Sequence, residues 1–186
     1  HDAMIEGGVI RKEKDAASLE LDGFGAHMIV AAKAVYPFSD ALTASLWVEP
    51  FELRNQTVLF GVPHDNDSWT TPMFGMYVHD GRAVFGLWGS PGTSKALLEA
   101  PEPLPLRAWT MLTAAFDGAT ITLYLDGLPV ARQSHRGTVV RNGQPLLVGK
   151  GLGDAKPSLR GRLGELRLYN RALSAGDVRA LFEATK

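Results

Sequence analysis

Short runs of alternating apolar and polar residues, separated by turn residues, recur along most of the chain. An Asp-Gly dipeptide stands between several of these runs, beginning at Asp22, Asp80, Asp117 and Asp126. Asp-Gly tolerates the positive φ angles that two-residue hairpin turns require. Apolar runs of period two joined by such turns are typical of antiparallel strands, so the pattern predicts an all-β protein.

The hairpin pattern is clearest from Met73 to Trp88. With Asp80 and Gly81 as the turn residues, one face should be uniformly apolar and should point toward the core; it carries Phe74, Met76, Val78, Ala83, Phe85 and Leu87. The opposite face carries the pairs His79/Arg82, Tyr77/Val84, Gly75/Gly86 and Met73/Trp88, which form a glycine floor flanked by Tyr77 and Trp88. This second face predicts either a surface for a flat ligand or a surface that a loop covers.

Similar patterns predict further strands on both sides of the hairpin. They cover residues 42–48, 57–62, 109–116, 121–125, 146–149 and 163–169. One helix is indicated near the C-terminus, because Ser174 is a good N-cap and Asp177 completes an approximate capping box. Apolar residues then recur on one face of that helix.

Three segments show no strand pattern. Residues 64–71 are polar, and residues 89–106 are rich in Pro and Gly. Both are predicted as long loops, which on β-sandwiches are common positions for binding. Residues 1–17 are assigned to an N-terminal segment, and residues 18–186 to the domain.

Composition narrows the class of protein. A chain of 186 residues with 45% hydrophobic residues suits one domain with a sizeable core. The net charge of −1 provides no basic surface for nucleic acid, and no apolar run is long enough to span a membrane. The lack of cysteine excludes disulfides and thiolate metal sites.

Four segments, in order, resemble the laminin-G-like members of the concanavalin A-like lectin/glucanase superfamily, which are common in bacterial extracellular proteins. They are residues 42–50, 109–118, 121–127 and 161–174, the last ending in Tyr-Asn-Arg-Ala-Leu-Ser. The resemblance covers about residues 18 to 183 and implies a two-sheet antiparallel jelly-roll sandwich with a short C-terminal helix. It also implies a secreted, periplasmic or cell-surface location, within a larger protein in many members.

The resemblance further implies a calcium ion at the rim, held by oxygens from the early Asp-Gly segment and from the closing strand. Asp22 stands at the first position, whereas the closing strand has Gly164 before Glu165 in place of the usual acidic pair. Calcium takes six to eight oxygen ligands, so the loss of one carboxylate weakens such a site without abolishing it. Asp22 and Glu165 are therefore the candidate ligands, and both a calcium-bound and a calcium-free domain stay open.

The polar segment supplies one candidate ligand site. Trp69 lies there among His64, Asp65, Asn66 and Asp67. An indole can stack on the CH face of a sugar while carboxylates and amides bind its hydroxyls. The alternatives are packing of Trp69 within the loop and a solvated turn at the acidic residues, which lack the downstream Gly and Glu of an EF-hand.

Other aromatic residues are interpreted by their strand positions. Tyr77, Trp88, His79 and Arg82 form the second candidate ligand site, on the glycine face of the hairpin. Trp47 and Trp109 lie within the strands of the resemblance and are predicted to be core residues.

Catalysis finds little support in the sequence. A glycosidase needs two carboxylates across the scissile bond, and the Glu-x-Asp-x-x-Glu run that hydrolases of this superfamily use is missing. A lyase would need a base beside a cation, which Tyr77, His79 and Arg82 supply only if their proximity is more than chance. The sequence therefore predicts a non-catalytic module that binds a polysaccharide or glycan. A protein-docking module of a larger extracellular protein and, third, a lyase or glycosidase are the alternatives.

Overall fold

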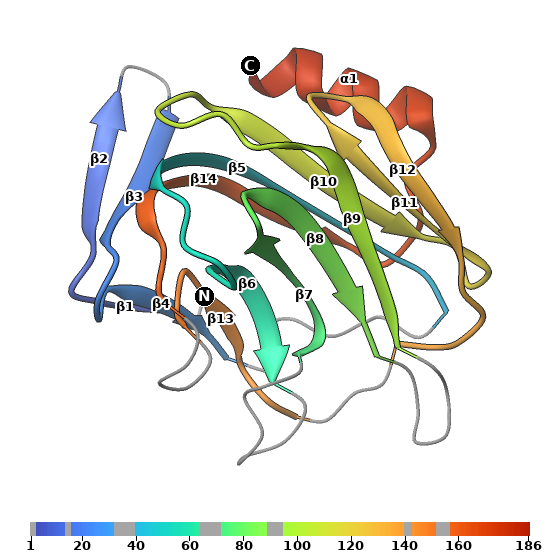
Figure 1. Cartoon of the computed structure of the whole chain (residues 1–186), viewed down its shortest axis with the longest axis horizontal. Helices are drawn as coiled ribbons and strands as arrows, with labels where there is room; N and C mark the ends of the chain where they lie inside the picture. Colours follow the sequence, from blue (N-terminus) through green and yellow to red (C-terminus); the bar gives the residue numbers. More distant parts are fainter. Residues whose placement is uncertain are drawn as a thin grey trace.

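Two antiparallel sheets lie face to face, with one helix outside them (Figure 1). The structure is a computed structural model that describes residues 3–13, 16–31, 40–63, 72–88, 95–139, 143–151 and 157–186. The first sheet, here the β7 sheet, has the order β1 (Ala3–Glu6), β4 (His27–Val30), β13 (Leu146–Val148), β6 (Val58–Pro63), β7 (Pro72–His79), β8 (Arg82–Leu87), β9 (Ala96–Pro103). The second, here the β5 sheet, has the order β12 (Leu128–Ser134), β11 (Thr120–Leu125), β10 (Thr110–Phe116), β5 (Leu42–Glu52), β14 (Arg160–Tyr169), β3 (Ala16–Asp22), β2 (Val9–Glu13). The helix α1 spans Ala175–Thr185.

The predicted jelly-roll sandwich with a short C-terminal helix is confirmed. Neighbouring strands come from distant parts of the sequence, since β14 pairs with both β3 and β5, and β13 lies between β4 and β6. Such long-range antiparallel pairing lets each strand present alternate side chains to the space between the sheets.

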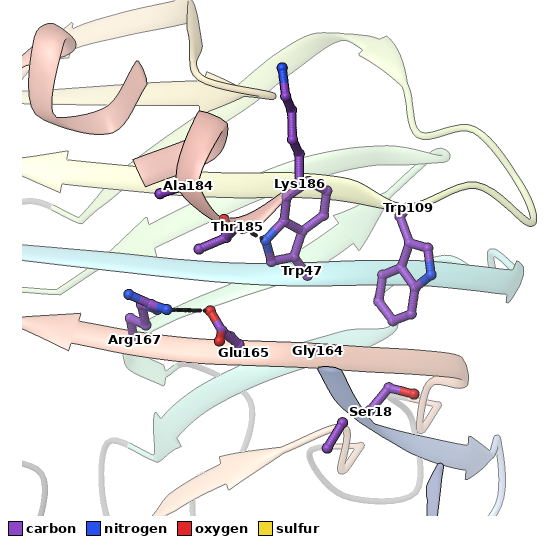
Figure 2. Close-up of a pocket in the computed structure, with 10 residues that line it drawn as sticks. Ser18, Trp47, Trp109, Gly164, Glu165, Arg167, Ala184, Thr185 and Lys186 are labelled. Carbon is purple, nitrogen blue, oxygen red and sulfur yellow. Dashed lines mark hydrogen bonds and ion pairs between the residues drawn. The ribbon is translucent and has the colours of Figure 1, made fainter. Parts of the chain in front are cut away.

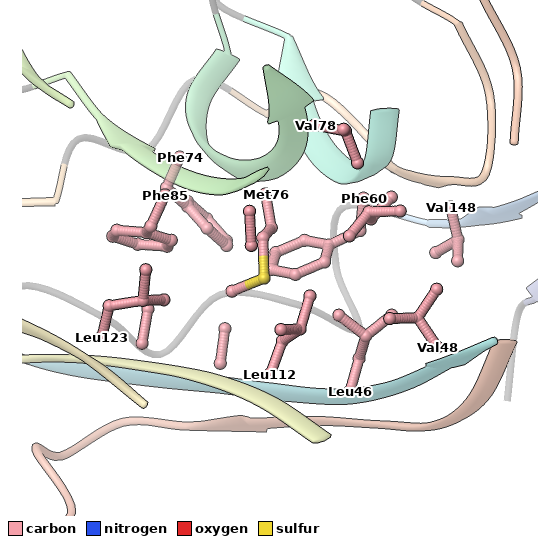
Figure 3. Packing of buried hydrophobic residues seen from close by; sticks show 14 of the residues in the cluster. Leu46, Val48, Phe60, Phe74, Met76, Val78, Phe85, Leu112, Leu123 and Val148 are labelled. Atoms are coloured by element: carbon pink, nitrogen blue, oxygen red, sulfur yellow. The ribbon is translucent and has the colours of Figure 1, made fainter. Parts of the chain in front are cut away.

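One apolar core fills the space between the two sheets (Figure 3). Phe60, Phe74 and Phe85 enter it from the β7 sheet and are completely buried. Leu46 and Leu112 face them from the β5 sheet and are also completely buried. Aromatic and aliphatic side chains thus interdigitate between the layers, which holds the two sheets together.

The β7–β8 hairpin has the predicted register. Phe74 lies opposite Leu87, Tyr77 opposite Val84, and His79 opposite Arg82. Asp80 and Gly81 form the turn with φ angles of 46° and 79°, as a two-residue turn of type I′ requires. The predicted apolar face is buried in the core, and the glycine face lies on the outer side of the β7 sheet. Met73, which was predicted on that outer face, packs in the core instead, and Val84 is buried.

Two segments without a predicted strand contain strands. Within residues 89–106, β9 is an edge strand that buries Ala96, Leu98 and Ala100 in alternation. Its prolines suggest a loop, but an edge strand tolerates proline because one row of its N–H groups has no partner strand. In the N-terminal segment, β1 pairs with β4 and β2 pairs with β3, so its described part extends both sheets.

Helix α1 covers part of the outer face of the β5 sheet. Its N-cap Ser174 and Asp177 form the predicted capping box, with both reciprocal hydrogen bonds present. Val178 of the helix packs with Met111 and Tyr124 in a second apolar cluster that is separate from the core.

The prediction that Trp47 and Trp109 are core residues is wrong. Leu46 and Val48 point into the core, so the alternation of β5 directs Trp47 to the outer face. There Trp47 packs against the second apolar cluster, which contains Val178 of α1. Trp109 belongs to none of the described apolar clusters and is partly exposed beside Arg162.

Candidate binding face on the β7 sheet

Glycine and aromatic residues lie on the outer face of β7, β8 and β9, here the glycine face. Gly75 and Gly86 are buried there, and Tyr77 and Trp88 are half-buried. Gly75 and Gly86 lie directly opposite each other in the hairpin, and Gly61 of β6 pairs with Gly75. A Cβ atom added at Gly86 would lie 2.5 Å from Cζ3 of Trp88 and 3.4 Å from Cδ2 of Leu97. The indole of Trp88 therefore rests on the glycine floor, in a position that a larger residue at 86 would not allow.

Charged side chains border the aromatic floor. Nδ1 of His79 lies 3.3 Å from Oε2 of Glu99, and Nη1 of Arg82 lies 3.5 Å from Oε1 of the same residue. Nε of Arg82 also donates to the carbonyl oxygen of Pro101, at 3.1 Å. These three side chains come from the adjacent strands β7, β8 and β9. They form a polar network of hydrogen-bond donors and acceptors at one end of the face.

Tyr77 stands between the floor and this polar network. Burial, and then the negative charge of Glu99, raise the pKa of the Tyr77 phenol above its usual range. The phenol therefore stays protonated at neutral pH.

The structure brings together four of the predicted ligand residues: Tyr77, Trp88, His79 and Arg82 share the glycine face. The other predicted ligand residues, His64, Asp65, Asn66, Asp67 and Trp69, lie outside the described residues.

Two members of the glycine face are not predicted by the sequence: Glu99 and Leu97. Both lie on β9, which was not predicted as a strand because residues 101 and 103 are prolines. The alternation of Ala96, Leu98 and Ala100 is the pattern that could have placed Glu99 and the 41% exposed Leu97 on the outer face.

Asp22, the first predicted calcium ligand, has other partners at the rim. Its Oδ1 accepts hydrogen bonds from the N–H groups of Phe24, at 2.8 Å, and Ala26, at 3.2 Å. The hydrogen bonds from these backbone donors lower the pKa of the Asp22 carboxyl, and the bond from Phe24 has the largest effect. Asp22 thus fixes the turn that follows β3.

Glu165, the second predicted ligand, does not meet Asp22. Asp22 pairs with Arg160 at one end of the β3–β14 ladder, and Leu163 already pairs with Leu19 three residues further along. Since a strand rises about 3.3 Å per residue, Glu165 lies about five residues, or roughly 16 Å, from the level of Asp22. Glu165 forms an ion pair with Arg167 instead, so the two carboxylates do not share one metal site. Among the described residues, no group of three or more His, Cys, Asp or Glu side chains could hold a metal ion.

A family model described as the concanavalin A-like lectin/glucanases superfamily matches residues 22–179, which is most of the chain. The chain belongs to this superfamily. None of the curated protein sequences matches the chain.

Solved structures of similar fold include a domain of an extracellular arabinanase and the binding domain of a mosquitocidal protein. Domain 4 of AbnA, a GH43 extracellular arabinanase from Geobacillus stearothermophilus in complex with arabinotriose, is 21% identical with a TM-score of 0.73, over 96% of this chain and 87% of that one. The binding domain of Paraclostridial Mosquitocidal Protein 1 is 18% identical with a TM-score of 0.75, over 98% of this chain and 47% of that one. A SAP-like pentraxin from Limulus polyphemus is 18% identical with a TM-score of 0.68, over 94% of this chain and 85% of that one.

These likenesses support the same fold in each case, and superfamily members of this fold include both lectins and glucanases. Among the described residues, no helix has the length and apolar character needed to cross a membrane.

Proposed function

We propose that this domain is a non-catalytic carbohydrate-binding module of an extracellular protein, with its ligand on the glycine face. The observation that carries the proposal is the indole of Trp88 resting on Gly86 beside the polar network of His79, Arg82 and Glu99. A sugar ring has an apolar CH face and a hydroxyl edge, so a supported aromatic ring beside donors and acceptors matches both parts.

Two further features fit binding of a chain rather than of one small molecule. The face is the outer side of a sheet, and Gly61, Gly75 and Gly86 lie side by side across β6, β7 and β8. Binding without cleavage is proposed because a glycosidase needs two carboxylates across the bond, and Glu99 is the only carboxylate in the polar network described above. That carboxylate is already paired with His79 and Arg82.

The test is a calorimetric titration of the purified chain with neutral and acidic oligosaccharides, beginning with arabinotriose because the AbnA domain is described in complex with it. Trp88→Ala should weaken binding by at least about tenfold, since it removes the aromatic surface. The incubated sugar should show no new reducing ends and no unsaturated product.

Leu128→Ala is the matched control, because Leu128 is a 57% exposed apolar residue on β12 of the other sheet. It should leave the affinity unchanged. Each titration is repeated with calcium and with a chelator, since calcium at the rim stays a prediction. Equal affinity of the wild-type chain and Trp88→Ala for every sugar that binds would contradict the proposed face, and product formation would contradict the absence of catalysis.

A protein-docking function is the second candidate. Four large apolar side chains on the N-terminal strands β1 and β2 are exposed, namely Met4 (54%), Ile5 (38%), Val9 (48%) and Ile10 (56%). Exposed apolar residues in such numbers are a feature of protein-binding surfaces. A folded domain that binds no glycan with or without calcium would favour this function.

A further inference from the structure

A hollow lies on the side of the molecule opposite the glycine face, between the end of α1 and the outer face of the β5 sheet (Figure 2). This hollow, here the indole pocket, has a volume of about 420 Å³. Its walls and floor come from β3, β5, β14, the residue before β10, and the end of α1; the residues used below are Trp47, Trp109, Gly164, Glu165 and Arg167. The volume lies within the range of small-molecule sites.

A β-bulge in β14 shapes the floor of the indole pocket. Leu163 pairs with Val48, and Leu166 pairs with Leu46. An advance of three residues along β14 therefore matches an advance of two residues along β5. Leu163 can then face the core while Gly164 and Glu165 both line the pocket outside. A bulge re-aims side chains in this way, and bulges are frequent beside functional sites.

Two indoles stand on either side of this floor. A Cβ atom added at Gly164 would lie 2.8 Å from Cβ of Trp47 and 3.6 Å from Cζ3 of Trp109. The absence of a side chain at residue 164 therefore keeps the space between the rings open, as Figure 2 shows.

The ring of Trp47 is fixed from behind. Its Nε1 donates to the hydroxyl of Thr185 at 3.0 Å, and its indole stacks on Phe182 with a centroid distance of 5.7 Å. The ring of Trp109 has the guanidinium of Arg162 5.4 Å from its centroid. Both aromatic walls are thus held before any ligand arrives, which lowers the entropic cost of binding.

Charged groups at the pocket are already neutralised. Arg162 is paired with Glu49, Arg167 with Glu165, and the Lys186 ammonium with Glu183. The Glu165–Arg167 pair is accessible, with side chains 52% and 41% exposed. It offers carboxylate acceptors and guanidinium donors side by side. An anionic ligand, by contrast, would have to compete with a protein carboxylate for each of the three cations Arg162, Arg167 and Lys186.

We propose that the indole pocket is a second carbohydrate site, distinct from the glycine face, that binds a neutral sugar ring between Trp47 and Trp109. The Glu165–Arg167 pair binds hydroxyls at the edge of that ring. A uronic acid is disfavoured there because of the ion pairs just described.

The test uses nuclear magnetic resonance of the 15N-labelled chain, whose four tryptophans give four indole N–H signals. Arabinotriose, xylotriose and lactose are the neutral probes, and trigalacturonate is the acidic probe. The neutral probes should shift the Trp47 and Trp109 signals at millimolar concentration, and trigalacturonate should not.

Trp109→Ala should weaken the response of Trp47 at least about tenfold and leave any response of Trp88 unchanged. Trp109 lies outside the described apolar clusters, so this variant should remain folded, which its thermal unfolding checks. Glu165→Gln should weaken the neutral probes and, because it releases Arg167 from its ion pair, should introduce binding of trigalacturonate. Trp88→Ala is the matched control and should not alter the indole pocket.

The proposal is overturned if no neutral probe shifts Trp47 and Trp109, or if wild-type chain prefers trigalacturonate at these two signals. A shift of Trp88 alone would overturn the second site and leave the glycine face standing. Shifts of Trp47 and Trp109 without any of Trp88 would support the indole pocket and contradict the glycine face.

Discussion

At the scale of single residues, two glycines shape the candidate sites because they have no Cβ atom. Gly86 leaves space for the indole of Trp88, and Gly164 leaves open the space between Trp47 and Trp109. In both cases the neighbour of the missing Cβ is an aromatic residue on the outside of a sheet. A methyl group at either position would therefore act on the binding surface rather than on the inter-sheet core.

Gly86→Ala should move the Trp88 ring while leaving the fold intact. The new Cβ would lie 2.5 Å from Cζ3 of Trp88, the far end of a side chain that can rotate away. We expect a changed indole N–H signal for Trp88, weaker binding of any sugar on the glycine face, and a free energy of unfolding lowered by no more than about 1 kcal/mol.

Gly25→Ala is the control for this change, because no heavy atom beyond the adjoining residues lies within 4 Å of a Cβ added at Gly25. An unaltered Trp88 signal in Gly86→Ala would contradict the placement of the indole on the glycine floor.

At the scale of elements, α1 links the capping box to the indole pocket. The hydroxyl of Ser174 accepts from the N–H of Asp177, and the Asp177 carboxylate accepts from the N–H and hydroxyl of Ser174. The other end of the helix brings Thr185 and Phe182 to Trp47. Fraying of α1 would therefore loosen one wall of the pocket.

Asp177→Asn should lower the stability of the protein at neutral pH but not in strong acid. Hydrogen bonds from the N–H and hydroxyl of Ser174, with Arg171 as a further partner, lower the pKa of the Asp177 carboxyl. A lowered folded-state pKa means that the stabilisation is complete above the unfolded-state pKa and is lost as pH falls through the folded-state value. Urea unfolding from about pH 7 down to about pH 2 should show wild type and variant converging at the acid end.

Ser134→Ala replaces an exposed serine on β12 and should follow the wild-type curve throughout. Ser174→Ala should cost about 1 kcal/mol, as the loss of an N-cap usually does. A constant difference between Asp177→Asn and wild type at all pH values would contradict the role of the ionised carboxylate.

At the scale of the whole molecule, one core joins both sheets and supports both outer faces. Residues of the β7 sheet and of the β5 sheet form one apolar cluster. The two candidate sites lie on opposite outer surfaces of this sandwich, so sugar binding at one need not obstruct the other. Loss of the core should disorganise both sites together.

Phe85→Ala should lower the free energy of unfolding by about 3–5 kcal/mol, because it leaves a cavity at the centre of the sandwich. Phe85 is completely buried between the sheets. Urea unfolding followed by tryptophan fluorescence and by circular dichroism should give coincident transitions at a lower midpoint than wild type. Leu128→Ala, at an exposed position, should change the free energy by less than about 0.5 kcal/mol. Separate transitions for the two probes would show that the sheets unfold independently.

The sequence alone determined what depends on neighbours along the chain. The period-two pattern around Asp80 and Gly81 predicted the β7–β8 hairpin with its register, and Ser174 with Asp177 predicted the start of α1. The turn and the cap are local, because their hydrogen bonds join residues only a few positions apart. The resemblance of four ordered segments predicted the superfamily and hence the sandwich that joins these elements. The family match confirms that superfamily.

The tertiary structure alone decided which residues share a surface. Glu99 reaches His79 because β9 adds to the edge of the β7 sheet, although its prolines suggest a loop. Trp47, Trp109 and Gly164 meet because β14 pairs with β5 over more than a hundred residues of intervening chain, and a bulge turns Glu165 outward. Asp22 and Glu165 were paired by analogy, yet the register of β3 against β14 separates them. Strand pairing across the sequence depends on the packing of the whole core, so no local pattern specifies which outer-face side chains become neighbours.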